Sequence, residues 1–230
     1  MIQKQSRIPS STELSRLEFA NTWVSRWRGS QRNRGRRSAL GKAIIVTGTP
    51  GTGKTTVAMG LAREIRADYI SLNQFAANNK LYSGVDRIRR SKIIDVAKTR
   101  KKLQSHLIHN ECPTVVDTHM PDGLVNKEYA QRVFVLRCHP RILEARLRRK
   151  KWKAGKIREN VLAEILDSCL SAAVNYYGRR KVAEFDTSRT TVKQCVSSLK
   201  KTLGKSFKRK IAVDWLAQLE KEGTLERYLK

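Results

Sequence analysis

Long apolar runs, paired cysteines and acidic side chains are all scarce in this sequence. No apolar stretch approaches the ~20 residues that span a bilayer, and the N-terminal segment MIQKQSRIPSS lacks the apolar core of a signal peptide. The four cysteines are too widely scattered for a disulfide framework or a zinc ribbon, which indicates a reducing compartment. We therefore expect a cytoplasmic protein, with no secretion and no membrane insertion.

The shortage of acidic residues leaves a large positive charge. The 230 residues include 48 Lys and Arg but only 20 Asp and Glu, so the net charge is +28 at pH 7. Such a surplus indicates polyanionic surroundings, which are nucleic acid or, less often, a membrane surface. The basic residues concentrate in the N-terminal arm, in residues 87–102 and 137–158, and at the C-terminus. Because 40% of the residues are hydrophobic, we expect a globular chain and not a disordered basic tail. Because of its positive charge, we expect this chain to contact RNA.

Composition divides the chain into three regions. Residues 1–41 predict a basic N-terminal extension with one amphipathic helix, and residues 205–230 predict a basic C-terminal helical extension. Residues 42–204 alternate short apolar runs with helical patterns, which predicts an α/β domain with a parallel sheet flanked by helices. Strands are expected at residues 43–46, 69–70, 115–116, 133–136 and 184–185. Helices are expected at residues 96–109, 141–151, 157–177 and 192–203 and near the C-terminus, where the apolar face contains Val213, Leu216 and Leu219.

Residues 48–55, GTPGTGKT, match the phosphate-binding motif G-x-x-x-x-G-K-[ST] in full. An apolar run precedes the motif and a helical pattern follows it, which is the strand–loop–helix context that the motif requires. Backbone N–H groups of such a loop surround the β-phosphate, and the helix N-terminus favours the anion. Lys54 supplies a cation for the β- and γ-phosphates, and the Thr55 hydroxyl can bind Mg²⁺. The motif predicts ATP binding by Gly51, Thr52, Gly53, Lys54, Thr55 and Thr56.

An aspartate and a histidine follow the apolar run at residues 114–116. An aspartate at the carboxyl end of a strand beside the P-loop strand holds the Mg²⁺ shell, usually through water, so Thr55 and Asp117 are the predicted metal site. His119 lies two residues further and points to the same side as Asp117 if the chain stays extended. The alternative for His119 is an ordinary surface histidine beyond a strand.

Six segments together resemble one family: TGTPGTGKTTVA, DYISLN, LYSGVD, VVDTH, VFVLRCHPRILEARLRRKKW and KIRENVLAEIL. Over about residues 42–203 the chain resembles the adenylate kinase isoenzyme six family, the adenylate-kinase-like ATPases of small-ribosomal-subunit maturation. The resemblance implies a P-loop nucleoside-monophosphate-kinase-like fold with a short NMP-binding segment, about residues 71–94, and a short lid, about residues 149–159. It ties His119 to ATP hydrolysis and to the switching of partner binding. It also implies two partners, rRNA and a platform protein of the small subunit.

The resemblance carries over to the lid and to the adenine side of the site. The family's lid arginine, a catalytic residue, falls on Lys150, with Arg149 one residue earlier. A lid cation neutralises the transferring phosphoryl group, but a lysine lacks the planar fork of arginine, so a bidentate clamp would need Arg149. Arg189 follows the last expected strand, in the loop that borders the adenine in the family.

The acceptor side departs from the family pattern. The arginine that contacts the monophosphate in the family falls on Ala77, and the acid before it falls on Gln74. The stretch at residues 86–92 is basic here, and its side chains could hold a phosphate or touch RNA. This departure weakens the case for AMP as acceptor and leaves ATP binding intact.

Three functions remain open at this stage. The first is an ATPase of ribosome assembly in which the reaction ATP + AMP = 2 ADP is weak or lost. The second is a small-molecule or nucleoside-monophosphate kinase without a ribosomal role, against which Ala77 and Gln74 argue. The third is a nucleotide-responsive RNA-binding module with negligible turnover, against which Lys54, Asp117 and His119 argue. The chain is too short for a AAA-type ATPase with its helical lid.

Overall fold

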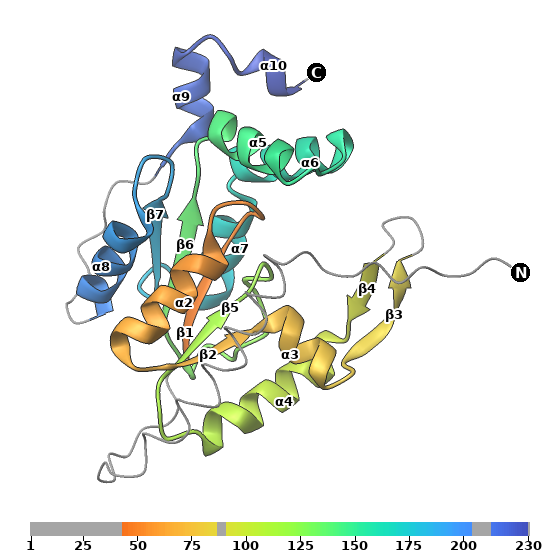
Figure 1. Cartoon of the computed structure of the whole chain (residues 1–230), viewed down its shortest axis with the longest axis vertical. Coiled ribbons are helices and arrows are strands. Elements are labelled where there is room, and N and C mark those ends of the chain that lie inside the picture. Colours follow the sequence, from red (N-terminus) through yellow and green to blue (C-terminus); the bar gives the residue numbers. More distant parts are fainter. Residues whose placement is uncertain (1–42, 87–90, 204–212, 230) are drawn as a thin grey trace, which may run out of the picture. The chain divides into compact units, whose positions relative to one another are not determined.

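A five-stranded parallel sheet forms the centre of the domain in this computed structural model (Figure 1). The strand order is β2-β5-β1-β6-β7, and every neighbouring pair is parallel. The strands are β1 (Ala43–Gly48), β2 (Asp68–Ser71), β5 (Thr114–Asp117), β6 (Ala130–Arg137) and β7 (Val182–Asp186). Each of the five expected strands lies within one of them, which confirms the predicted α/β fold.

The structure describes residues 43–86, 91–203 and 213–229, and all of them belong to one compact unit, Ala39–Lys230. The predicted N-terminal extension, residues 1–41, lies outside the described residues together with its amphipathic helix. Within the described ranges, none of the helices has the length and apolar character that a membrane crossing requires.

Helices cover both faces of the sheet (Figure 1). The helices of the described residues are α2 (Lys54–Ile65), α3 (Leu72–Asn78), α4 (Val96–His109), α5 (Pro140–Arg149), α6 (Ala154–Ile165), α7 (Ser168–Tyr177), α8 (Val192–Leu203), α9 (Trp215–Lys221) and α10 (Glu226–Leu229). Of these, α2 and α8 cover one face of the sheet, and α4 and α7 cover the other. Successive strand side chains point to opposite faces. Ile44 and Val46 therefore share a buried cluster with α2 and α8, whereas Ala43 and Ile45 share one with α4 and α7. Because β1 is buried on both faces, its sequence is one continuous apolar run.

The single helix predicted at residues 157–177 is wrong, because the chain forms two helices there, α6 and α7. The break lies at Leu166 and Asp167, and Asp167 has a φ of 54° in the left-handed region. Its carboxylate contacts the guanidinium of the buried Arg137. A helical pattern cannot reveal this break, because the partner lies 30 residues away in the sequence.

The predicted NMP-binding segment contains α3 and a hairpin of two antiparallel strands, β3 (Tyr82–Asp86) and β4 (Ser91–Ile94). No strand was expected here, because these residues form no continuous apolar run. Most of β3 is exposed, and Val85 is 62% exposed. Helix α4 follows, capped by Asp95, whose carboxylate accepts a hydrogen bond of 3.0 Å from the backbone N–H of Lys98.

The C-terminal helices α9 and α10 pack on α5 and α6, the two helices that flank the predicted lid. Leu147 of α5 and Val161 of α6 share a buried cluster with Leu219 of α9 and Tyr228 of α10. This part of the cluster joins segments that are far apart in the sequence, and Figure 1 shows α9 and α10 beside α5 and α6.

The apolar face predicted for the C-terminal helix is correct at Leu219, which is buried, and wrong at Leu216. Leu216 is 40% exposed, whereas Trp215 is 2% exposed. Asp214 caps α9 by accepting a hydrogen bond of 3.0 Å from the backbone N–H of Ala217, so the helix begins at Trp215. Its buried residues are Trp215 and Leu219, which lie one helical turn apart.

Candidate active site

The phosphate-binding loop joins β1 to α2 and fits tightly against its neighbours. Gly48 has a φ of 135°, and a Cβ atom there would lie 2.3 Å from the carbonyl oxygen of Leu136. Gly51 has a φ of 100°, and a Cβ atom there would lie 2.7 Å from a methyl group of Leu143. The two glycines allow the loop to turn between β6 and α5 where any side chain would clash.

Lys54 lies inside the curve of the loop. Its Nζ atom donates a hydrogen bond of 3.1 Å to the carbonyl oxygen of Thr49, which also accepts one of 2.9 Å from the Thr52 hydroxyl. Burial lowers the pKa of Lys54, and the negative charge of Asp117 opposes that shift. The site therefore places a lysine ammonium beside the backbone of the P-loop and within electrostatic reach of a carboxylate.

Asp117 ends β5, which lies directly beside β1. The two strands are in register, with Val46 opposite Asp117. The Thr55 hydroxyl donates a hydrogen bond of 2.7 Å to Oδ2 of Asp117, and the Tyr69 hydroxyl donates one of 3.2 Å to the same atom. Asp117 is only 7% exposed, so donors from α2 and β2 fix its orientation.

Thr55 and Asp117 provide oxygen donors that suit Mg²⁺. Mg²⁺ prefers hard oxygen ligands and is usually held by one or two carboxylates together with waters and substrate phosphates. Within the described part of the chain, no three His, Cys, Asp or Glu residues converge as a metal site. A hydroxyl and one carboxylate beside a phosphate-binding loop could therefore hold Mg²⁺ together with phosphate oxygens and waters.

His119 follows β5 and is exposed. Partial desolvation lowers the pKa of His119 below its ordinary value of 6.5, and the positive charge of Lys54 lowers it further. The charge of Asp117 acts in the opposite direction. These influences place His119 in the same charge environment as Lys54 and Asp117, with a neutral ring at pH 7.

The two lid residues lie at the end of α5. Arg149 is the last residue of the helix and Lys150 is its C-cap, and both are exposed. The charge of Lys150 contributes to the lowered pKa of Lys54, so the lid turn lies within electrostatic reach of the P-loop. The ammonium of Lys156, in the first turn of α6, lies 4.6 Å from the centre of the ring of Trp152.

The loop after β7 is attached to the P-loop. The hydroxyl of the buried Thr187 lies 2.8 Å from the carbonyl oxygen of Thr52, and Arg146 of α5 donates a hydrogen bond of 2.8 Å to the Thr187 carbonyl. Arg189, the predicted adenine contact, lies two residues further and is exposed. The structure therefore brings the start of this loop to the nucleotide site and leaves Arg189 at its exposed part.

The acceptor side offers no guanidinium on α3. Gln74 and Ala77 are both exposed on this helix, so the position of the family's arginine presents a methyl group. Lys92 of β4 lies with its ammonium 4.8 Å from the centre of the Tyr82 ring. The alternative phosphate contacts, Arg87, Arg89 and Arg90, lie outside the described residues.

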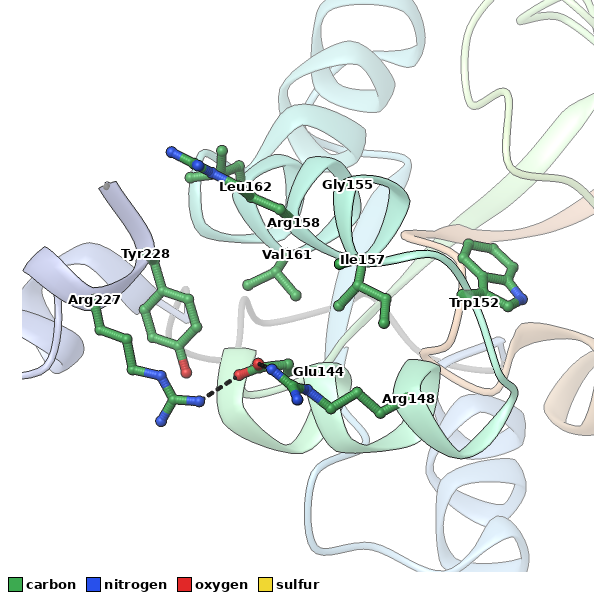
Figure 2. Close-up of a pocket in the computed structure, with 11 residues that line it drawn as sticks. Glu144, Arg148, Trp152, Gly155, Ile157, Arg158, Val161, Leu162, Arg227 and Tyr228 are labelled. Carbon is green, nitrogen blue, oxygen red and sulfur yellow. Dashed lines mark hydrogen bonds and ion pairs between the residues drawn. The ribbon is translucent and has the colours of Figure 1, made fainter. Parts of the chain in front are cut away.

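A cavity of about 640 Å³ lies beside the lid, between α5, α6 and α10 (Figure 2). Its walls are largely apolar and include Ile157, Val161 and Tyr228. Glu144 and Arg227 form an ion pair of 2.9 Å at its edge. No P-loop residue lines this cavity, so the cavity is separate from the phosphate-binding loop.

Sequence reasoning missed a buried carboxylate behind the P-loop. Glu164 of α6 is 2% exposed, and its Oε2 atom accepts a hydrogen bond of 2.5 Å from the Thr49 hydroxyl. Its Oε1 atom accepts one of 2.9 Å from Nε of Arg137, which is 1% exposed. The available signal was Arg137 itself, a charged residue that directly follows four apolar residues of a buried strand.

The chain is similar to a protein family and to several archaeal proteins. It matches the family described as AAA domain over residues 44–167. It is 33% identical over 183 residues to a "Putative adenylate kinase" of Methanocaldococcus jannaschii, covering 80% of this chain and 98% of that protein. It is 37% identical over 183 residues to a "Putative adenylate kinase" of Saccharolobus solfataricus, covering 80% and 92%. A solved gluconokinase from Sinorhizobium meliloti 1021 has a TM-score of 0.46 and 16% identity over 73% of this chain and 93% of that one.

The family match covers the core of the candidate site. Residues 44–167 include the P-loop, Asp117, His119 and the lid turn, and the match ends before α7. The archaeal proteins match this chain over nearly their whole length. The chain belongs to the adenylate-kinase-like family of P-loop phosphotransferases.

Proposed function

We propose that the chain is a cytoplasmic enzyme that binds ATP with Mg²⁺, hydrolyses it, and acts in maturation of the small ribosomal subunit. The observation that carries the ATP part is the 2.7 Å contact between Thr55 and Asp117, next to Lys54. A loop lysine, a loop hydroxyl and a strand-end carboxylate are the groups with which P-loop enzymes hold nucleotide phosphates and magnesium.

Each residue of the site has a role in this proposal. The backbone of residues 51–56 and the Lys54 ammonium bind the phosphates. Thr55 and Asp117 hold Mg²⁺, the latter through water, and the metal when bound neutralises phosphate charge. His119 is neutral at pH 7 and can accept a proton or a hydrogen bond from an attacking water.

The lid and the loop after β7 complete the site. Lys150, supported by Arg149, supplies positive charge to the transferring phosphoryl group. Arg189 contacts the adenine. Both assignments come from the family resemblance. Two observations support them: Lys150 acts electrostatically on Lys54, and Thr187 links the Arg189 loop to the P-loop.

Water is the favoured acceptor in this proposal, and AMP is the second candidate. The absence of a guanidinium on α3 at Ala77 and Gln74 removes the expected contact to a monophosphate. The reaction ATP + AMP = 2 ADP should therefore add little to basal hydrolysis.

The ribosomal part rests on the charge and on the family resemblance. Exposed basic residues gather on α4 and around the lid: Lys98, Lys101, Lys102, Arg148, Arg149, Lys150, Lys151, Lys153, Lys156 and Arg158. Such residues neutralise RNA phosphates with little sequence preference. Arg137, which the sequence placed at the edge of this basic stretch, is buried in an ion-pair network and contributes nothing to the surface.

The decisive experiment measures ATP turnover by the purified full-length chain with and without AMP, and repeats it with small-subunit rRNA. We expect Mg²⁺-dependent hydrolysis that AMP stimulates little. Formation of two ADP per ATP at micromolar AMP would instead identify a nucleoside-monophosphate kinase. RNA binding without turnover would identify a nucleotide-responsive binding module.

A further inference from the structure

The C-terminal helix α9 reaches the P-loop through a single buried side chain. The indole Nε1 of Trp215 donates a hydrogen bond of 3.1 Å to Oε1 of Glu164, which lies in the last turn of α6. The other carboxylate oxygen of Glu164 accepts the 2.5 Å bond from the hydroxyl of Thr49. Two consecutive hydrogen bonds therefore connect α9 to the phosphate-binding loop.

Thr49 in turn holds the loop around Lys54. Its side chain is buried, and its carbonyl oxygen is the one that accepts from both the Thr52 hydroxyl and the Lys54 ammonium. A rotation or shift of Thr49 would move the carbonyl that Lys54 contacts. The Glu164 carboxylate, which fixes the Thr49 hydroxyl, thus influences where Lys54 lies.

Glu164 can position Thr49 because the Glu164 carboxylate is itself held by several hydrogen-bond donors. Besides Thr49 and Trp215, it accepts bonds from Nε of Arg137 at 2.9 Å and from the backbone N–H of Cys138 at 3.0 Å. An ionised carboxylate accepts hydrogen bonds and donates none, so a buried one depends on every donor around it. Removal of the indole N–H leaves Glu164 with three donors and takes one of the three bonds to its Oε1 atom away.

A second contact links α9 to the adenine-side loop. The rings of Trp215 and His139 meet edge to face, with centroids 5.2 Å apart. The backbone N–H of His139 donates a hydrogen bond of 2.7 Å to the hydroxyl of Ser188, in the loop that follows β7. Glu222, at the end of α9, lies 3.4 Å from Nε2 of His139. Helix α9 is therefore connected to both segments, to the P-loop through Glu164 and to the loop after β7 through His139.

We infer that Trp215 is a positioning residue of the nucleotide site, which acts through Glu164 to hold Thr49 and the P-loop in the shape that the nucleotide requires. The inference rests on the proposed function in that the ligand is an adenine nucleotide. It makes the C-terminal helix part of the nucleotide-binding unit, so displacement of α9 weakens nucleotide binding without any change in the P-loop sequence.

The test compares two substitutions on α9 in the full-length chain. Trp215→Phe removes the indole N–H but keeps an aromatic ring. Leu219→Val, the matched control, trims the buried face of α9 and leaves the hydrogen bond in place. We expect Trp215→Phe to weaken ADP binding by about tenfold, as the loss of a hydrogen bond to a charged group does, and to raise KM for ATP more than it lowers kcat. Leu219→Val should bind ADP as the unaltered chain does.

A second pair of variants tests the P-loop end of the connection. Thr49→Val removes the hydroxyl at nearly constant volume, and Thr49→Ser retains it. We expect Thr49→Ser to bind ADP more tightly than Thr49→Val. In the double variant Thr49→Val/Trp215→Phe, the loss of ADP-binding free energy should be smaller than the sum of the losses in the two single variants, because both changes act through Glu164. If Trp215→Phe does not fold, the two Thr49 variants still test the connection, because equal ADP binding by Thr49→Val and Thr49→Ser would overturn the inference.

The outcomes separate this inference from the function on which it rests. If the unaltered chain does not bind ADP, both are overturned. If it binds ADP and Trp215→Phe matches Leu219→Val, or if the effects at Thr49 and Trp215 add independently, this inference alone is overturned.

Discussion

At the scale of single residues, the two charged groups of the candidate site, the Asp117 carboxylate and the Lys54 ammonium, each contact only uncharged hydrogen-bond partners among the described residues. Oδ2 of Asp117 accepts hydrogen bonds from Thr55 and Tyr69, and the Lys54 ammonium is held by one backbone carbonyl. The carboxylate and the ammonium are therefore oriented by neutral donors and acceptors, and neither is consumed in a direct ion pair with the other. Both charges remain available for a nucleotide phosphate and its metal.

Lys54→Ala should abolish ATP turnover while the fold is retained. The ammonium stabilises charge on the transferring phosphoryl group, and loss of such a contact commonly costs ~10²–10³ in rate. A steady-state phosphate-release assay measures the loss, with circular dichroism as the control for folding. Unchanged turnover would remove the P-loop from the mechanism.

The pH dependence of turnover should report His119. Its pKa is lowered from 6.5, chiefly by desolvation, so the ring is neutral at pH 7 and above and gains its proton only at lower pH. If the neutral ring acts on water, the rate should be level through pH 7 to 8 and should fall only below about pH 6.5, the ordinary histidine range. In His119→Asn the rate should be lower and this acid limb should be missing. An acid limb that persists in the variant belongs to another group.

At the scale of secondary-structure elements, Arg137 joins β6 to α6 and β7. Its guanidinium contacts the carboxylates of Glu164, Asp167 and Glu184, and it is itself 1% exposed. Burial alone would lower the pKa of Arg137, but the charges of Glu164 and Asp167 raise it above its ordinary value. The network fixes the break between α6 and α7, and with it the helix that carries Glu164.

Arg137→Met should strongly destabilise the fold. It leaves buried carboxylates without their cation, and breaking a buried pair in this way costs about 3–5 kcal/mol. Arg148→Met is the matched control, because Arg148 pairs with Glu144 at 2.6 Å from a side chain that is 69% exposed, and such surface pairs contribute only about 0–1 kcal/mol. Urea denaturation measures both changes. If both variants lose the same free energy of unfolding, the Arg137 network does not stabilise the fold.

The elements that the sequence predicted are those with a local signal. The buried strands are apolar runs, and the P-loop is a contiguous motif between β1 and α2. The break at Asp167 and the burial of Trp215 in place of Leu216 were not predictable, because each depends on a partner distant in sequence. Thr49 and Glu164 lie 115 residues apart. A lone Glu or Trp in a helical pattern carries no mark of such a contact.

At the scale of the whole molecule, the net charge of +28 shapes every encounter with another macromolecule. Among the described residues, one group of exposed basic side chains lies on α4 and around the lid, and others lie on α2 and α8. The one fully buried arginine of this described part, Arg137, is neutralised by its carboxylates. The lid that would close over a nucleotide is therefore also part of the surface that would meet RNA.

Binding to rRNA should weaken steeply with salt. If six to ten phosphates are neutralised, affinity should fall ~10³–10⁵-fold between about 50 and 200 mM monovalent salt. Deletion of residues 1–41 removes nine basic and two acidic residues, so the slope of log affinity against log salt should become shallower. ATP turnover should change little, because all the residues assigned to the nucleotide lie after residue 42. A truncation that abolishes ATP turnover but preserves RNA affinity would contradict the assignment of part of the RNA binding to residues 1–41 and of turnover to the rest of the chain.

The shared carboxylate of Glu164 has a consequence for how this protein can change in evolution. One side chain serves the P-loop, the buried Arg137 and the C-terminal helix, so no single substitution at Glu164 can suit all three. Among relatives, positions 49, 164 and 215 should therefore vary together or not at all. A lineage that loses the C-terminal helix must supply another donor to Glu164, and an alignment of such lineages would reveal which residue took over.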